Sequence, residues 1–308
     1  MTANAQASST RVGFIGVGNM GQPMAGHLVK AGWQVTVYDT APDKTRAFVE
    51  THGGAVASTL AELAAKSDVV ITMLPDGKIV RHVALGGDDN LVKGLTDSGR
   101  RGAAIIDMSS SAPVGTRELG ADLKKHGIDL IDAPVSGGVK GAVAGTLAIM
   151  VGGDEALAKQ LDSVLAPIGK RFYIGALGSG HAAKVLNNYV SAAGLVAAAE
   201  AVLVGQRFGI DAQKLIDVIN ASTGRNNSTE NKFAQFILNG KFNSGFALGL
   251  MAKDLTLAME VADACDVPAE LGHACLELWK EAEKAVGGAA DHTEVARYVN
   301  EHSTRSSR

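Results

Sequence analysis

Six residues near the start of the chain, Gly16-Val17-Gly18-Asn19-Met20-Gly21, have the glycine spacing of a phosphate-binding turn. They follow an apolar run at residues 12–15 and open a helical stretch at 20–30, which Gly32 ends. In such a turn the first two glycines allow a tight bend and a close backbone approach to a pyrophosphate, and the third lets helix and strand pack. Because the free amides of a helix N-terminus bind phosphate, this context predicts a dinucleotide site rather than a glycine-rich turn alone.

An acidic residue, Asp39, follows the next apolar run, residues 34–38, about 20 positions after the loop. At this place in a dinucleotide-binding unit, a carboxylate accepts hydrogen bonds from the 2′-hydroxyl of the adenosine ribose, whereas a 2′-phosphate would bring two anions together. We therefore expect NAD, while Lys44 and Arg46 lie close enough in the sequence to leave NADP open. The alternative for Asp39 is a helix cap, since Pro42 suits the first position of a helix.

Lys184 and Asn188 lie four residues apart in an apolar stretch with the period of a helix. Side chains at this spacing project from one face, one turn apart, so both can contact one small molecule. Burying an ammonium without a function is costly, and desolvation would lower its pKa from about 10.4. Lys184 is therefore a candidate for exchanging a proton with a substrate hydroxyl, and a solvated polar edge of the helix is the alternative.

Two loops after predicted strands carry hydroxyl groups or glycines. One is Asp132-Ala133-Pro134-Val135-Ser136-Gly137-Gly138, which continues to Gly141. The bare amides of such a loop can bind a carboxylate, and a flexible turn is the alternative. The other, Ser109-Ser110-Ser111, suits both a helix start before Pro113 and a strand-end loop that faces a cofactor.

The elements that would position these residues alternate between strand and helix in the first half of the chain. Thr59 with Glu62 has the pattern of a capping box, and Gly127 that of a helix stop. Apolar runs rich in β-branched residues, most of them separated by amphipathic patterns such as 60–66 and 114–126, occur at residues 12–15, 35–38, 69–73, 105–108, 128–131 and 147–151. Such runs suit a parallel sheet buried on both faces. We expect an α/β fold with a Rossmann-type, doubly wound, mostly parallel sheet over residues 11–176.

After residues 172–174 the strand patterns cease, and the chain from His181 onward has helical periodicity. We expect a flexible N-terminus at residues 1–10 and an all-α domain at 177–308 for substrate binding and oligomerisation. A helix from about 181 to 208 is too apolar to have one exposed side, so most of its faces should be covered. This domain alone or another subunit can provide the cover, and we expect a homodimer or homotetramer.

The composition limits the classes of partner. With 308 residues and a formal net charge of −3, the chain offers no electrostatic reason to bind nucleic acid or an anionic membrane. Cys265 and Cys275 are too few for a disulfide framework and lack metal-site spacing, so we expect two small buried side chains in a reducing compartment and no metal. Residues 1–10 lack the apolar core of a signal peptide, and the stretch 189–204 contains Glu200 and is short for a membrane span. We expect a cytoplasmic protein.

Taken together, the motifs resemble those of the β-hydroxyacid dehydrogenases, whose named members include 3-hydroxyisobutyrate dehydrogenase and tartronate semialdehyde (2-hydroxy-3-oxopropionate) reductase. The resemblance covers about residues 12–262 and rests on four motifs in the family's order: the glycine loop with Met20-Gly21-Gln22-Pro23-Met24-Ala25, the loop 132–138 continuing through Gly145-Thr146-Leu147, the segment Gly178-x-Gly180-x-x-x-Lys184-x-x-Asn187-Asn188, and Lys253-Asp254.

The resemblance implies an NAD-dependent interconversion of a small β-hydroxyacid and its semialdehyde or keto form by hydride transfer. It implies that Lys184 is catalytic, that Ser136, Gly137, Gly138 and Asn188 bind the substrate, and that the cofactor contacts Gly16, Val17, Gly18, Asn19, Met20, Gly21, Asp39, Leu74, Pro75, Ser110 and Lys253. Outside the resemblance, Lys253 would be a surface charge paired with Asp254.

Some positions depart from the family's pattern. His27 stands where the family usually has asparagine, and we interpret it as a packing residue. Ser109-Ser110-Ser111 replaces a more usual Ser-Thr-Ile. Arg225 lies where relatives differ with substrate, and it is either a ligand for a second acidic group or an exposed loop arginine. Two rival hypotheses are a non-catalytic dinucleotide-binding scaffold and an imine reductase, and the presence of Lys184 argues against both.

Overall fold

The computed structural model describes residues 10–99 and 102–302. The predicted flexible N-terminus therefore lies outside the described residues, except for Thr10. The chain divides into two compact units, one ending at Lys184 and the other beginning at Val185. The boundary expected from the sequence, after residue 176, is eight residues earlier, because the first turns of a long helix belong with the first unit.

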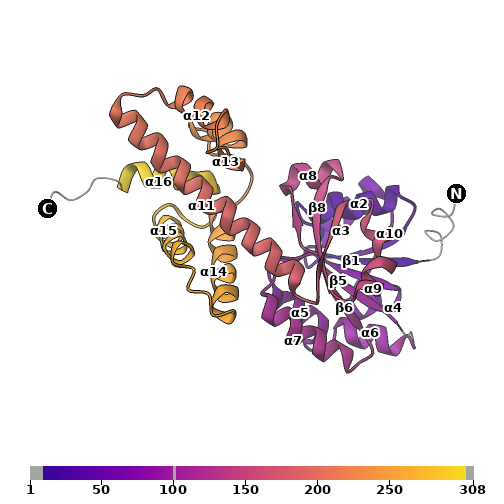
Figure 1. Ribbon diagram of the computed structural model, residues 1–308. Coiled ribbons are helices and arrows are strands. Elements are labelled where there is room, and N and C mark those ends of the chain that lie inside the picture. The colour runs from indigo at the N-terminus through magenta and orange to yellow at the C-terminus, as the bar shows by residue number, and fades with distance from the viewer. Residues whose placement is uncertain (1–9, 100–101, 303–308) are drawn as a thin grey trace. The chain divides into compact units, whose positions relative to one another are not determined.

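The first unit is built on one nine-stranded sheet (Figure 1). Its strands are β1 (Arg11–Ile15), β2 (Gln34–Tyr38), β3 (Ala55–Val56), β4 (Val69–Thr72), β5 (Ala104–Asp107), β6 (Asp129–Asp132), β7 (Val135–Ser136), β8 (Leu147–Gly152) and β9 (Gly169–Gly175). They lie in the order β3-β2-β1-β4-β5-β6-β8-β7, and β9 also pairs with β8. Only the β6–β8 and β7–β8 pairs are antiparallel among the strand pairs of the described residues. The predicted doubly wound, mostly parallel sheet is confirmed.

Helices cover both faces of this sheet (Figure 1). They are α2 (Gly21–Lys30), α3 (Pro42–His52), α4 (Leu60–Ala65), α5 (Gly77–Leu85), α6 (Leu91–Asp97), α7 (Pro113–Lys124), α8 (Gly138–Ala144), α9 (Glu155–Gln160) and α10 (Asp162–Leu165). In β4, Val69 and Ile71 join the core under α2, α3 and α8, while Val70 joins the core under α4 to α7. Because successive strand residues point to opposite faces, apolar residues at every position fill two cores at once.

The strand order reverses direction at β1, and the carboxyl ends of the neighbouring strands meet at one edge. There the register places Ile15 beside Thr72, Thr72 beside Asp107, and Asp107 beside Asp132. In open α/β sheets, ligands bind in the crevice outside the carboxyl ends of the strands at such a switch point. The polar residues that end β4, β5 and β6 therefore lie at the edge where a site is expected.

The second unit contains only helices among its described elements. They are the long α11 (Ser179–Phe208), which begins in the first unit, α12 (Ala212–Asn220), α13 (Asn227–Asn231), the π-helix η1 (Phe233–Ile237), α14 (Leu248–Ala264), α15 (Glu270–Val286), the 3₁₀ turn η2 (His292–Glu294) and α16 (Val295–His302). Their core includes the fully buried side chains of Trp279 in α15, Leu195 in α11 and Leu255 in α14. The predicted all-helical C-terminal region is confirmed. The π-helix and the 3₁₀ turn left no periodic pattern in the sequence.

Helix α11 is, in the described part of the chain, the one helix long and apolar enough to cross a membrane by length and composition. Within the second unit, Ala192, Leu195 and Val202 of this helix are buried in the core. Leu186, Val190, Val204 and Phe208 are exposed large apolar residues, however, and Phe208 is 85% exposed. Within this chain, therefore, other residues cover only part of the surface of α11. The expectation that most of its faces are covered is met only in part.

Two further details differ from the sequence predictions. The segment expected to be a loop after Asp132 contains the two-residue strand β7, and Gly138 already begins α8. Cys275 is buried as expected, but Cys265 is exposed. Cys265 is the C-cap residue after the last residue of α14, so its side chain lies outside the packed part of the helix.

Candidate functional site

The glycine loop has the backbone geometry that its spacing predicts. Gly16 has φ of +92°, and a Cβ atom there would lie 2.3 Å from the carbonyl oxygen of Met73. A Cβ atom on Gly21 would lie 1.8 Å from the carbonyl oxygen of Gly16, so this glycine lets α2 start directly against the turn. At Gly18, no heavy atom of the described residues other than those of its chain neighbours lies within 4 Å of the corresponding position. Two glycines thus permit close packing, and the middle one leaves open space where a pyrophosphate could approach the backbone.

Asp39 lies beside this loop at the end of β2. Its Oδ2 accepts a hydrogen bond from the amide of Val17 at 3.0 Å, and its Oδ1 accepts one from the amide of Ala41 at 2.9 Å. The N-cap residue of α3 is Ala41, which has no side-chain cap, so Asp39 is not the capping residue that was the alternative. Since a carboxylate has about four acceptor positions, both oxygens can still accept a hydrogen bond from a ribose hydroxyl.

The loops after β4 and β5 are joined by a side-chain hydrogen bond. The amide of Leu74 donates to the Oγ of Ser109 at 2.9 Å, which connects the segment Met73-Leu74-Pro75 to the serine loop. Ser109 and Ser111 are buried, whereas Ser110, the proposed cofactor contact, is half-buried between them. The side chains of Ser109 and Ser111 are therefore part of the packed interior, whereas the side chain of Ser110 is more accessible.

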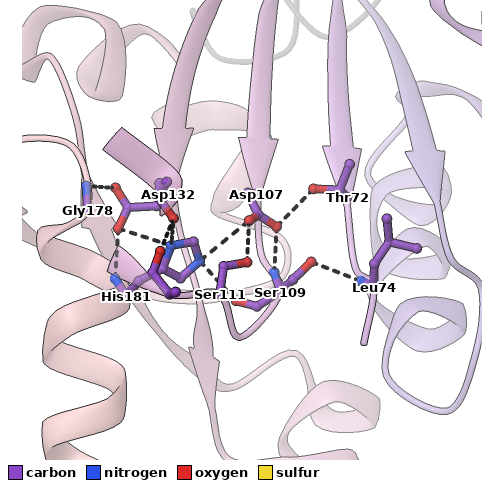
Figure 2. A network of polar contacts seen from close by, with 10 residues as sticks. Thr72, Leu74, Asp107, Ser109, Ser111, Asp132, Gly178 and His181 are labelled. Carbon is purple, nitrogen blue, oxygen red and sulfur yellow. Dashed lines mark hydrogen bonds and ion pairs between the residues drawn. The ribbon is translucent and has the colours of Figure 1, made fainter. Parts of the chain in front are cut away.

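Asp107, which ends β5, is a buried carboxylate that holds this serine loop (Figure 2). Its Oδ1 accepts hydrogen bonds from the Oγ1 of Thr72 at 2.9 Å and from the amide of Ser109 at 3.0 Å, and its Oδ2 accepts one from the Oγ of Ser111 at 2.8 Å. A buried carboxylate is tolerated when such donors replace its water. Asp107 thereby fixes the backbone of Ser109, whose Oγ accepts the hydrogen bond from the amide of Leu74.

His181, in the first turn of α11, is fully buried beside two carboxylates (Figure 2). Its Nε2 lies 3.1 Å from the carbonyl oxygen of Ser109, and its Nδ1 lies 2.8 Å from the Oγ1 of Thr116. A carbonyl oxygen only accepts, so Nε2 carries a hydrogen and donates it. The same ring nitrogens lie 3.6 Å from Asp107 Oδ2 and 3.7 Å from Asp132 Oδ2.

Asp132, which ends β6, caps the N-terminus of α11 (Figure 2). Its Oδ1 accepts the amide of Gly178 and its Oδ2 accepts the amide of His181, both at 2.7 Å. The first amides of a helix have no partner within the helix, and a carboxylate there also interacts favourably with the helix dipole. Lys184 follows His181 by three residues, and only 8% of its surface is exposed. The candidate proton-transfer lysine is thus buried on a turn tied to the sheet.

The predicted carboxylate-binding loop lies after the same strand. Ser136 is half-buried in β7, where it pairs with Ala148 of β8, and Gly137 and Gly138 are exposed with φ values of +130° and +60°. His27 of α2 lies beside the C-terminal end of α8, with its Nε2 3.0 Å from the carbonyl oxygens of both Ala142 and Val143. The interpretation of His27 as a packing residue agrees with these contacts, which hold α8 against α2.

In the second unit, Asn188 is buried and linked to α14. Its Nδ2 donates to Asp254 Oδ2 at 2.7 Å, and Lys253 Nζ lies 3.7 Å from Asp254 Oδ1. Lys253 therefore pairs with Asp254, but its partner is a buried acid that also fixes an amide of α11. Arg225 is 62% exposed at its side chain and lies 3.6 Å from Glu230, so the exposed-loop alternative describes its position here.

The sequence did not reveal the polar network around His181. Nothing in local periodicity connects this histidine with Ser109, which is 72 residues earlier in the chain. The one available indication was that the apolar runs ending at Asp107 and Asp132 both finish on an acid, and that parallel strands bring such ends to one edge of a sheet.

Two family sequence profiles match consecutive parts of the chain. The NAD binding domain of 6-phosphogluconate dehydrogenase matches residues 11–178, and the NAD-binding domain of NADP-dependent 3-hydroxyisobutyrate dehydrogenase matches residues 178–299. The first match contains the glycine loop, Asp39 and the strand-end acids. The chain therefore has an NAD(P)-binding domain, as the loop geometry indicates.

Individual relatives match over almost their full length. A 2-(hydroxymethyl)glutarate dehydrogenase of Eubacterium barkeri is 37% identical, with 94% of each chain covered. A probable 3-hydroxyisobutyrate dehydrogenase of Mycobacterium tuberculosis is 39% identical, covering 93% of this chain and 95% of the relative. The solved structure of the M. tuberculosis 3-hydroxyisobutyrate dehydrogenase with L-serine has a TM-score of 0.84 at 38% identity, covering 94% of this chain and 99% of the other. The chain belongs to the β-hydroxyacid dehydrogenase family.

Proposed function

We propose that this NAD(P)-dependent dehydrogenase interconverts a small β-hydroxyacid and its semialdehyde or keto form, in the manner of 3-hydroxyisobutyrate dehydrogenase. The observation that carries the proposal is the buried Lys184 on the capped first turns of α11, in a chain that also has the glycine loop and Asp39. An ammonium 8% exposed on an apolar helix costs free energy, which a role in proton transfer would explain.

In this proposal each candidate residue has one role. The nicotinamide, when bound, supplies the hydride chemistry. Lys184 takes the proton from the substrate hydroxyl in oxidation and returns it to the carbonyl oxygen in reduction. Asn188 orients that oxygen, and its own position is set by Asp254. Ser136, Gly137 and Gly138 bind the substrate carboxylate, because the exposed glycines leave backbone amides accessible to an anion.

The remaining proposed contacts belong to the cofactor. Asp39 would accept hydrogen bonds from the ribose 2′-hydroxyl and so favour NAD over NADP. The loop amides, from Gly16 through Gly21, would approach the pyrophosphate. Leu74, Pro75 and Ser110 would line the cofactor's path, and Lys253 would act on its nicotinamide side.

The test is a panel of initial rates with short hydroxyacids, including 3-hydroxyisobutyrate, glycerate and 3-hydroxybutyrate, and with tartronate semialdehyde in the reducing direction. Lys184→Ala should lower kcat by orders of magnitude while NADH binding stays within about threefold. Lys184→Arg should be nearly as slow, because arginine keeps the charge but does not release a proton. Lys125→Ala, which removes an exposed lysine at the C-cap of α7, is the control. An active Lys184→Ala enzyme would refute the mechanism, and no turnover of any compound would favour a dinucleotide-binding scaffold.

We also propose a homodimer or homotetramer formed through the helical unit, in the cytoplasm and without a nucleic-acid or membrane partner. The support is the apolar side of α11, where Val190 and Val204 are each 67% exposed. A second copy covering this side would remove apolar surface from water. Light scattering after size-exclusion chromatography should report a dimer or tetramer that Val190→Glu dissociates, while Val114→Glu, on α7, leaves it intact. A monomeric parent protein would refute this proposal.

A further inference from the structure

We propose that Asp132 and His181 are positioning residues, which fix Lys184 to the nucleotide-binding unit by holding the first turn of α11. The proposal rests on the proposed role of Lys184 in proton transfer. It assigns to these two residues no contact with substrate or cofactor. Their role would be to set where the lysine lies.

The first observation is the origin of the helix cap. An ordinary N-cap is a side chain at the start of the helix itself, whereas the cap of α11 comes from Asp132, 46 residues before Gly178. This carboxylate is fully buried and takes two of the amides that the helix would otherwise leave without a partner. The position of the first turn therefore depends on the end of β6, not on a local loop.

The second observation is how closely the helix approaches the sheet. A Cβ atom on Gly180 would lie 2.2 Å from the carbonyl oxygen of Met150 in β8 and 2.9 Å from Asp132 Oδ2. The backbone of α11 at this point therefore touches the strand directly, with no side chain between them. Such contact leaves the turn little room to shift sideways.

The third observation is that His181 ties the same turn to the loop after β5. Its ring bridges the carbonyl oxygen of Ser109 and the hydroxyl of Thr116 of α7, and Ser109 receives the amide of Leu74. The turn that carries the lysine and the segment proposed to pass the cofactor therefore share one hydrogen-bonded support. Residues three apart on a helix lie on one side, so a shift of His181 would move Lys184 with it.

The fourth observation is where the first unit ends. The division of the chain into compact units falls directly after Lys184, and Asn188 lies in the second unit. On this basis the proton-transfer group is carried by the unit that binds the cofactor. A change in the cap should then alter the chemical step more than cofactor affinity, since a misplacement of about 1 Å can cost roughly 10²-fold in rate.

The experiment compares Asp132→Asn with Asp154→Asn. Asp154 lies in the same unit, and its carboxylate caps α9 rather than α11, through the amide of Leu157 at 2.8 Å. Three quantities are measured for each full-length variant: kcat, the NADH dissociation constant, and amide hydrogen exchange of the peptide covering residues 179–186 without cofactor. For Asp132→Asn we expect kcat to fall by about 10- to 100-fold and exchange to rise about tenfold, with NADH binding within about threefold. Asp154→Asn should change none of the three appreciably.

His181 is tested by two replacements. His181→Gln keeps an N–H group that can reach the Ser109 carbonyl, whereas His181→Leu keeps none, so glutamine should retain several-fold more of kcat than leucine. Should the leucine variant fail to fold, the glutamine and Asp132→Asn variants still decide the matter. Unchanged exchange in Asp132→Asn would overturn the proposal, and so would faster exchange with unchanged kcat. Retained activity in Lys184→Ala would instead refute the proposed function, and the exchange data would remain a separate result.

Discussion

Replacing Asp39 by asparagine should shift the enzyme's cofactor preference from NAD toward NADP. The structure shows why the carboxylate cannot relieve a clash by moving, since the amides of Val17 and Ala41 hold one oxygen each, at 3.0 and 2.9 Å. A 2′-phosphate placed beside it would meet a fixed negative charge. Asparagine keeps the shape of the side chain and removes that charge.

The magnitude follows from two contributions. A hydrogen bond from the ribose hydroxyl to a carboxylate is worth about 1.5–3 kcal/mol, and NAD loses most of this with asparagine. Two unit charges about 5 Å apart repel by about 3 kcal/mol at an effective dielectric constant near 20, and NADP is relieved of that repulsion. The backbone amide left without an acceptor affects both cofactors alike. The ratio of kcat/KM values, NAD over NADP, should therefore fall by about 10³- to 10⁴-fold.

The assay measures initial rates with both cofactors and one saturating hydroxyacid, together with direct titration of NADH and NADPH. The control is Asp43→Asn at the start of α3, where the carboxylate is 92% exposed and paired with Arg46 at 3.2 Å. Removing this nearby charge should change the ratio by less than about threefold, as expected for an exposed ion pair. If both variants changed the ratio equally, or if Asp39→Asn left it unchanged, Asp39 would not be the residue that binds the ribose 2′-hydroxyl and sets the cofactor preference.

Three further predictions concern the helical unit. Burial lowers the pKa of Lys232 to about 8, so the fold becomes more stable as the pH rises from 8 to 10.5. In urea titrations at pH 7, Lys232→Met should raise the free energy of unfolding by about 2 kcal/mol. Burial also lowers the pKa of His292 to about 4, so the free energy of unfolding should fall by up to about 3 kcal/mol as the pH drops from 6.5 toward 4. His292→Gln should flatten this pH dependence. Iodoacetamide should modify the exposed Cys265 first, while burial that raises the pKa of Cys275 to about 11 protects it until unfolding, as peptide mass spectrometry would show.

The parts of the fold that sequence predicts are those with a local cause. The strand β1 and the helix α2 follow from apolar runs and from the stop at Gly32, and each observed boundary lies within one or two residues of its expectation. Thr59 accepts the amide of Glu62, as its capping pattern predicts, although the Glu62 side chain reaches Ser58 rather than Thr59. The strands β3 and β7, of two residues each, are too short to leave a pattern.

The parts that sequence could not predict depend on contacts between distant segments. The register across β4, β5 and β6 aligns Thr72, Asp107 and Asp132, and no single segment contains this information. His181 has the same neighbours in sequence whether its ring faces solvent or two acids. The exposure of Cys265 likewise depends on where α14 leaves the core, which periodicity places only within a few residues.

The polar network at the ends of β5 and β6 is better explained by a role in positioning α11 than by a contribution to the stability of the fold. Two carboxylates and an imidazole are withdrawn from water there, with Asp107, Asp132 and His181 each at most 2% exposed. Apolar residues of similar size often make a fold equally stable or more so, because desolvating charges costs several kcal/mol for each ion. What apolar packing would not provide is direction: the amides of Gly178 and His181 each donate a hydrogen bond of 2.7 Å to Asp132, and these bonds fix both the distance and the angle of the first turn of α11. In the proposed mechanism, where Lys184 transfers a proton, such direction would place its amine, and β6, which provides Asp132, also leads directly into the segment containing Ser136.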